Sequence, residues 1–218
     1  MDSEISGRQK TYLVILSLLG WFALISQFYI NINSKISSIP ETMIRYFSYF
    51  TINSNLIVTV CATIILLKPN VKLTRFLSRQ SSQTAIAVYI FIVGLIYNVI
   101  LRFIWNPEGL QMIVDELLHL VIPVLFITYW ILFSNKNQLN RKIIIPWLTY
   151  PFIYIIFVLT RGSWSGFYPY PFINVNELGL NAVLFNCVGI AVLFILVSLI
   201  FVAVGNYIVR KKLVSMEV

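Results

Sequence analysis

The sequence predicts an all-α polytopic membrane protein, with six transmembrane helices in one bundle and both termini in the cytoplasm. Three observations predict this fold. Hydrophobic residues make up 59% of the 218 residues and charged residues only 11%, whereas soluble domains carry roughly 25% charge. The apolar residues gather in six runs, and Lys and Arg gather in alternate connections between these runs. A chain with so much apolar surface requires lipid as the solvent for most of it.

The six apolar runs have about the length of a spanning helix, which needs roughly 20 residues. They cover residues 11–30, 46–67, 85–105, 115–133, 143–160 and 182–209. The fourth and fifth runs are short and the sixth is long, so we expect their tilts to differ. The connections between them are brief, which favours antiparallel neighbours. We therefore expect one domain over residues 1–218.

The first run follows Arg8 and Lys10, and no small-residue cleavage site follows it. These features indicate a retained helix rather than a cleaved signal peptide.

The positions of Lys and Arg predict the orientation of the bundle. Twelve of the 16 basic residues fall on one side and four on the other, and the larger group marks the cytoplasmic side. The twelve are Arg8, Lys10, Lys68, Lys72, Arg75, Arg79, Lys136, Arg141, Lys142, Arg210, Lys211 and Lys212. We expect a multi-pass protein of the cell membrane.

The formal net charge of +8 does not indicate nucleic-acid binding, because the basic residues lie between apolar runs. There they report topology and contact with anionic lipid headgroups, so membrane lipids are the expected partners. Cys61 and Cys187 both fall inside apolar runs. This position indicates small buried hydrophobes and argues against a disulfide framework or a thiolate metal cluster.

The second run carries a polar stripe. Ser48, Thr51, Asn55 and Thr59 recur at spacings of three and four, so one continuous helix would place them on one face. Thr51 would lie roughly 7–8 Å below the outer boundary if the helix begins near residue 46. Such a stripe fits either a helix-packing face, where small polar residues are common, or the wall of a polar pocket.

The fourth run contains the only histidine, within the segment DELLHLVIP. Asp115 and Glu116 lie four and three residues before His119, so either carboxylate could hold the imidazole. A helix that begins near Asp115 places His119 roughly 6 Å deep, which is close to the depth expected for Thr51. Pro123 should kink the helix and free the carbonyl of His119. The alternative interpretation is a structural histidine paired with a carboxylate.

Other polar residues fall in the same outer layer, whereas the inner halves of the runs are almost wholly apolar. The third run contributes Asn98 and Arg102 near its outer end. Further members are Asn53, Thr160, Arg161, Asn181 and Asn186. Because buried polar groups in a bilayer face the bundle interior or a wet cavity, this one-sided pattern predicts a pocket near the extracytoplasmic side.

The connection 161–179, RGSWSGFYPYPFINVNELG, is rich in aromatic residues and proline. We expect no regular element there. The aromatic residues favour either a belt anchor at the membrane interface or a lid that admits a lipid tail. The aromatic residues are Trp164, Phe167, Tyr168, Tyr170 and Phe172.

A single histidine limits the possible chemistry. Bis-histidine haem, a three-histidine zinc site and a di-iron bundle with two Glu-x-x-His motifs all need more histidines. A mixed metal site from Asp115, Glu116 and His119 remains possible, with nothing further to indicate it. The sequence has no G-x-S-x-G elbow and no phosphate-binding glycine loop. What remains is an oxygen nucleophile with His119 as base, needing no metal or organic cofactor, or no chemistry at all.

Three segments resemble one family. YFTINSNLIV (49–58), HLVIP (119–123) and TYPFIYIIFVLTRG followed by FYPYPF (149–172) are similar to the Pr6Pr family of bacterial six-helix membrane proteins. That family is related to the androgen-induced gene and androgen-dependent TFPI-regulating proteins. Members often have glutamine where Asn53 stands and aspartate where Asn174 stands. The resemblance spans about residues 10–210.

The resemblance implies a threonine hydrolase that cleaves lipid esters, of the fatty acid ester of hydroxy fatty acid type or similar. Thr51 matches the threonine nucleophile and His119 the histidine. We expect His119 to act as general base and Asp115 or Glu116 to orient it. The oxyanion or substrate could be bound by Asn55, Asn98 or Arg102.

Two alternatives have no chemical step. The same pocket could belong to a non-enzymatic lipid-binding or transport protein, or the chain could be a structural subunit.

Overall fold

The computed structural model describes residues 5–68, 71–134 and 139–214, and within these ranges it is helical with no strand. Lys136, one of the basic residues that predict the orientation, lies outside the described residues. Six helical segments are long and apolar enough to cross a membrane. They are Gly7–Asn33, Phe50–Leu67, Gln80–Phe103, Gly109–Leu132, Arg141–Ser165 and Leu180–Lys211. The predicted all-helical fold with six apolar spans is confirmed.

The long helices pack against one another in one bundle, and α1 contacts α7 as well as α3. Helix α1 (Gly7–Asn33) packs against α3 (Phe50–Leu67), and α3 packs against α5 (Gln80–Val99). Helix α5 in turn contacts α7 (Ile122–Leu132) and α11 (Leu180–Val214). Of the short elements, α4 (Lys72–Leu77) connects the second and third spans. The turn η1 (Leu101–Phe103) ends the third span, and η3 (Arg141–Ile143) and α8 (Ile144–Trp147) begin the fifth.

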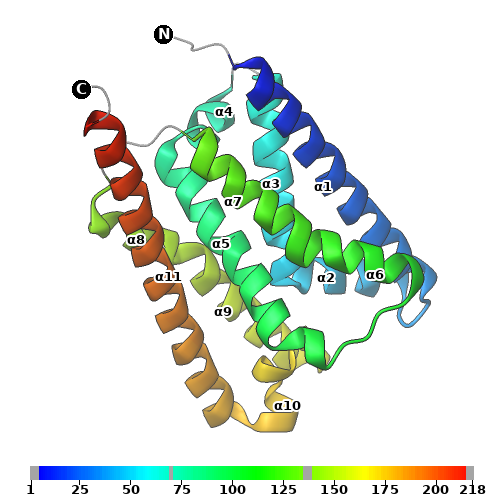
Figure 1. Cartoon of the computed structure of the whole chain (residues 1–218). Coiled ribbons are helices and arrows are strands. Elements are labelled where there is room, and N and C mark those ends of the chain that lie inside the picture. The colour runs from blue at the N-terminus through cyan, green and yellow to red at the C-terminus, as the bar shows by residue number, and fades with distance from the viewer. Residues whose placement is uncertain (1–4, 69–70, 135–138, 215–218) are drawn as a thin grey trace.

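The start of α1 and the end of α11 lie at the same end of the bundle (Figure 1). The short helix α10 (Val175–Leu178) lies at the opposite end, which we call the α10 end.

The burial pattern is that of a membrane bundle. Small and branched apolar side chains such as Ala23, Val58 and Ala87 are fully buried between helices. By contrast, large apolar side chains on the outside, such as Leu18 and Phe185, are 66% and 79% exposed. Lipid is the solvent that can cover such a surface without penalty.

The predicted continuous helix over 46–67 is wrong at its beginning. Helix α2 (Ile39–Ser48) ends first, Tyr49 is extended with φ −83° and ψ 126°, and α3 begins at Phe50. Ser48 therefore does not share a helix with the rest of the predicted polar stripe. Thr51 is the second residue of α3 rather than a residue one and a half turns into a helix.

Side chains stabilise this break by pairing the carbonyls that it frees. The side-chain amide nitrogen of Asn53 donates to the freed carbonyl of Phe47 (2.7 Å). It also donates to the carbonyl of Tyr49 (3.0 Å), which accepts the backbone N–H of Asn53 as well. The hydroxyl of Tyr154 donates to the carbonyl of Ser48 (2.9 Å). Unpaired backbone carbonyls are costly inside a bilayer, so the bonds to the carbonyls of Phe47 and Ser48 allow α3 to begin within the bundle.

The fourth span begins at Gly109, six residues before the predicted start, and changes its winding at the histidine. Helix α6 (Gly109–Glu116) passes into a π-helical turn η2 (Leu117–Val121) and then into α7. Asn98 donates to the carbonyl of His119 at 3.2 Å, the carbonyl that we expected Pro123 to free.

The predicted irregular connection 161–179 is wrong in part. Helix α9 (Thr149–Ser165) continues to Ser165, where Gly166 ends it with φ +71°. A 3₁₀ turn η4 (Pro171–Ile173) and α10 follow. Asn174 caps α10 by accepting a hydrogen bond from the N–H of Asn176 at 3.2 Å, a local cap that the proline-rich composition concealed.

Candidate functional site

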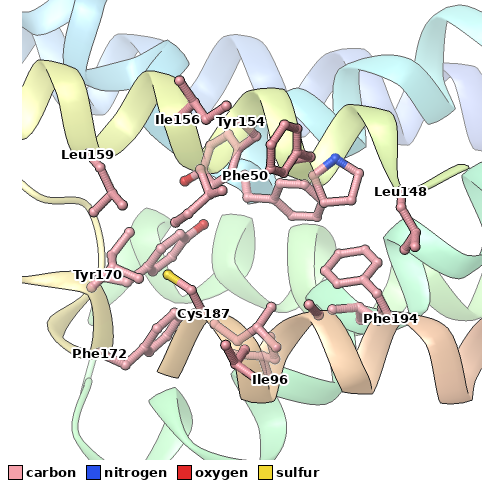
Figure 2. A pocket seen from close by; sticks show the side chains of 18 of the residues that line it. Phe50, Ile96, Leu148, Tyr154, Ile156, Leu159, Tyr170, Phe172, Cys187 and Phe194 are labelled. Atoms are coloured by element: carbon pink, nitrogen blue, oxygen red, sulfur yellow. The ribbon is translucent and has the colours of Figure 1, made fainter. Parts of the chain in front are cut away.

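A cavity of about 720 Å³ lies between α3, α5, α9, α11 and η4. Figure 2 shows Tyr170 and Phe172 at one end of this cavity and Leu148 and Phe194 toward the other. Its wall is almost wholly apolar, and within the described part of the chain no charged side chain lines it. The cavity can therefore hold an uncharged hydrocarbon group, and hydroxyl groups are its main polar features.

Thr51 is on the wall of this cavity, in the first turn of α3. Its side chain is 8% exposed, so it faces the inside of the bundle rather than lipid. The first N–H groups of a helix have no partner within the helix, and no side chain caps α3 at Tyr49. The break after α2 thus places the hydroxyl of Thr51 at the N-terminus of α3.

Tyr170 meets Thr51 from the connection between α9 and α10. Its hydroxyl accepts a hydrogen bond from the N–H of Thr51 at 3.2 Å and lies 3.3 Å from Oγ1 of Thr51. The ring stacks on Phe172 and meets Tyr49 edge-on. Burial raises the pKa of Tyr170 to about 12, so its hydroxyl stays protonated at neutral pH.

Asn55 joins the Thr51 segment to the His119 segment. Its amide nitrogen donates to the carbonyl of Thr51 at 2.9 Å and to the carbonyl of Leu118 at 3.1 Å. Because both oxygens bond to one nitrogen, they lie no more than about 6 Å apart. The two segments that contain the predicted pair are therefore neighbours within the bundle.

His119 is 8% exposed and held on two sides. Nδ1 bonds to the backbone carbonyl of Asp115 at 2.9 Å, and the Asp115 carboxylate lies 3.7 Å from Nδ1. Since a carbonyl oxygen only accepts, Nδ1 carries the proton and Nε2 is the basic nitrogen. The ring stacks on Tyr97 with centroids 3.8 Å apart, and the Tyr97 hydroxyl donates to the Asp115 carboxylate at 2.6 Å.

Thr51 and His119 do not share a hydrogen bond. Among the described residues, the partner of Oγ1 of Thr51 is Tyr170, and His119 bonds to Asp115. His119 does not line the cavity, whereas Tyr97 both lines it and contacts the histidine ring. The prediction that Thr51 and His119 lie at the same depth assumed helices that begin near residues 46 and 115. The helices begin instead at Phe50 and Gly109, so the assumption behind this prediction is wrong.

The remaining predicted site residues are already paired. Asn98 donates to the carbonyls of Gly94 (2.7 Å) and His119 (3.2 Å). Arg102 binds Glu116 at 2.5 Å. Both N–H groups of Asn55 and of Asn98 are thus used by backbone carbonyls, and the Glu116 carboxylate pairs with Arg102 rather than with the imidazole.

A cationic cluster holds the connection that carries Tyr170. Glu41 pairs with Arg45 (2.7 Å) and Arg161 (2.6 Å), and both guanidinium groups lie over the Phe167 ring. The hydrogen bond from Arg45 lowers the pKa of Glu41, so this carboxylate is ionised at neutral pH. The ring of Phe167 meets Tyr49, which meets Tyr170. This cluster links α2 and α9 to the cavity end.

The sequence did not identify Tyr97 and Tyr170 as residues of the site. Tyr97 directly precedes Asn98, which the sequence indicates as a polar residue of the outer layer. A tyrosine near a membrane boundary is typical of an aromatic belt, so Tyr97 did not stand out. Tyr170 was grouped with the aromatic residues of the connection, as an anchor or lid. Both residues have a hydroxyl group, which needs a hydrogen-bond partner inside a bilayer, and this requirement could have indicated them.

Comparison with known proteins adds no assignment, since no protein-family model, curated protein or solved structure matches the chain.

Proposed function

We propose that the protein is an intramembrane threonine hydrolase that cleaves lipid esters, with Thr51 as nucleophile and His119 as general base. One observation carries the proposal: the hydroxyl of Thr51 lies at a helix N-terminus on the wall of a large apolar cavity. A helix N-terminus favours the developing negative charge of an alkoxide or oxyanion. The apolar remainder of the cavity suits the acyl chain of a fatty acid ester.

The reaction has two steps. In the first, Oγ1 of Thr51 bonds to the ester carbonyl carbon while its proton passes to Nε2 of His119. The tetrahedral intermediate then breaks its bond to the alkoxy oxygen, which takes the proton from His119 and leaves as the alcohol. In the second, water attacks the acyl-threonine, gives a proton to His119, and releases the fatty acid as Oγ1 regains that proton.

Proton transfer needs one rearrangement, because Oγ1 bonds to Tyr170 here. His119 does not line the cavity, so a path for the proton from Oγ1 to Nε2 has to form when the ester binds, through a movement of Thr51 or through water molecules. The Asp115 carbonyl holds the other ring nitrogen, so Nε2 is the nitrogen available as base. Tyr97 fixes the plane of the ring by stacking on it.

We also propose that the α10 end faces the extracytoplasmic side of the cell membrane and that both termini are cytoplasmic. The distribution of basic residues supports this orientation. Under it, a lipid ester would reach the cavity from the outer leaflet. Kinship with the Pr6Pr family, which rests on the segments around Thr51, His119 and residues 149–172, belongs to the same proposal.

Hydrolysis of 4-nitrophenyl octanoate by purified protein in detergent tests the reaction. Thr51→Val keeps the shape of the side chain and removes the hydroxyl, so we expect kcat to fall to background. Thr51→Ser, which keeps the nucleophile, should retain activity. His119→Gln should lower kcat by about 10²- to 10⁴-fold, the usual contribution of general base catalysis.

Thr63→Val is the matched control, because Thr63 is on the same helix and bonds to Trp21 (3.1 Å) away from the cavity. Its activity should equal that of the wild type. The alternative, a lipid-binding or transport protein, is favoured by the uncharged wall of the cavity. It predicts that the wild type does not hydrolyse the ester and that Thr51→Val still binds a fatty acid.

A further inference from the structure

Catalysis by Thr51 requires donors for the oxyanion, and the donors expected from the sequence are not free. The amide N–H groups of Asn55 and Asn98 donate to backbone carbonyls. Arg102 pairs with Glu116 and does not line the cavity. The side-chain oxygen donors that remain on the described cavity wall are hydroxyl groups, and the one beside Oγ1 of Thr51 is that of Tyr170.

We infer that Tyr170 supplies this donor and is the oxyanion-stabilising residue of the hydrolase; the inference rests on the proposed function. Its hydroxyl lies 3.3 Å from Oγ1 of Thr51, on the same wall of the cavity. The oxyanion forms on the carbon atom that Oγ1 attacks, so it forms beside this hydroxyl. The Tyr170 O–H can therefore turn toward the oxyanion as the new bond forms.

The N–H of Thr51 strengthens this donor. It donates to the Tyr170 oxygen at 3.2 Å, and a hydroxyl that accepts one hydrogen bond donates a stronger one. Because Thr51 is in the first turn of α3, its N–H also carries part of the positive end of the helix dipole. The dipole of α3 thus acts on the oxyanion through the phenol.

Packing holds the phenol for this role. The Tyr170 ring stacks on Phe172 with centroids 5.2 Å apart and meets Tyr49 edge-on at 5.8 Å. Tyr49 is the extended residue between α2 and α3, so the break that exposes the helix N-terminus also positions the phenol. A donor fixed before the reaction needs no reorganisation during it.

Tyr170→Phe tests the inference, since phenylalanine keeps the ring contacts and removes only the hydroxyl. With 4-nitrophenyl octanoate as substrate, we expect kcat to fall by about 10²- to 10³-fold, as for loss of one oxyanion donor. KM should change little, because the hydroxyl acts on the transition state rather than on the bound ester. Far-ultraviolet circular dichroism and thermal unfolding in detergent should match the wild type.

Tyr168→Phe is the control from the same connection. The Tyr168 ring lies over Gly162 and does not line the cavity, so its kinetics should equal those of the wild type. An unchanged kcat in Tyr170→Phe, or a rise in KM alone, would overturn the role of Tyr170 while Thr51→Val still abolishes turnover. An inactive wild type, or an active Thr51→Val variant, would instead overturn the proposed function itself.

Discussion

At the scale of single residues, the site depends on side chains that satisfy backbone groups inside a bilayer. Asn53, Tyr154 and Asn98 each pair a carbonyl that a helix irregularity frees. Such pairing is required where no water can substitute for a missing partner. The residues that could perform chemistry, Thr51 and His119, lie next to these irregularities. The candidate hydroxyl and imidazole groups thus occur where the helices depart from regular winding.

Asn55 provides the sharpest test at this scale, because it bonds to the segments of both Thr51 and His119. Asn55→Leu removes the bond to Leu118 with little change of volume. Interhelical hydrogen bonds in membranes contribute roughly 0.6 to 2 kcal/mol each, so we expect a loss of about 1 kcal/mol in unfolding free energy. Thermal unfolding in detergent measures it.

Ser198→Ala is the control for this variant, since the buried Ser198 hydroxyl has no hydrogen-bond partner among the described residues. Its removal should leave the melting temperature unchanged or raise it slightly. Equal stabilities for Asn55→Leu and the wild type would mean that Asn55 does not hold the two segments together.

At the scale of elements, the polar stripe of α3 has two roles along its length, as a cavity wall and as a helix-packing face. Thr51 lines the cavity, whereas Thr59 packs against Gly20 of α1 and bonds to the carbonyl of Asn55 at 2.8 Å. The stripe is a helix-packing face around Thr59, and at Thr51 it faces a cavity. The two interpretations that the sequence left open therefore apply to different turns of one helix.

Because Gly20 packs directly against Thr59, adding one methyl group at position 20 should strongly lower the stability of the protein. A Cβ at position 20 would overlap Oγ1 of Thr59 and reach its Cβ at 3.0 Å. Gly20→Ala should therefore force α1 away from α3 and lower the unfolding free energy by about 1–3 kcal/mol. In a Thr59→Ala background the loss should be smaller, because two of the overlapping atoms are gone.

Gly189→Ala is the matched control, since nothing lies within 4 Å of a Cβ at position 189 of α11. It should be neutral or slightly stabilising, as alanine favours helix over glycine. A double-mutant cycle in which Gly20→Ala and Thr59→Ala are additive would contradict direct packing between these positions.

The apolar helices were predictable because their length and composition leave a bilayer as the only suitable solvent. The break at Tyr49 was not predictable, because neither glycine nor proline marks it and its stabilising partner Tyr154 is distant in sequence. The histidine segment was partly predictable from Pro123. The pairing of Glu116 with Arg102 was not, since it depends on how α5 and α6 meet.

At the scale of the whole molecule, polar side chains form hydrogen bonds near both ends of the bundle, whereas the sequence indicated one end only. Trp130 donates to Thr84 (3.0 Å) and Trp147 donates to Ser81 (3.1 Å) near the other end of α5. The two ends of the bundle therefore differ in which polar groups they contain. The α10 end combines a hydroxyl, an imidazole and the apolar cavity, whereas these pairs at the other end join helices.

The orientation can be tested with single cysteines in a background where Cys61 and Cys187 are replaced by alanine. Ser163→Cys lies near the α10 end and Lys72→Cys in α4, and both positions are exposed. A membrane-impermeant maleimide added to intact cells should label Ser163→Cys and not Lys72→Cys. The reverse pattern would place the cavity end in the cytoplasm.

The central claim is that the hydroxyl of Thr51 is a nucleophile, and its covalent adduct is the most direct test. Purified protein would be treated with an alkyl fluorophosphonate, digested, and analysed by peptide mass spectrometry. We predict one phosphonate on Thr51, absent from Thr51→Val and strongly reduced in His119→Gln. An adduct on another residue, or an unmodified protein that nevertheless retains a bound fatty acid, would contradict the claim.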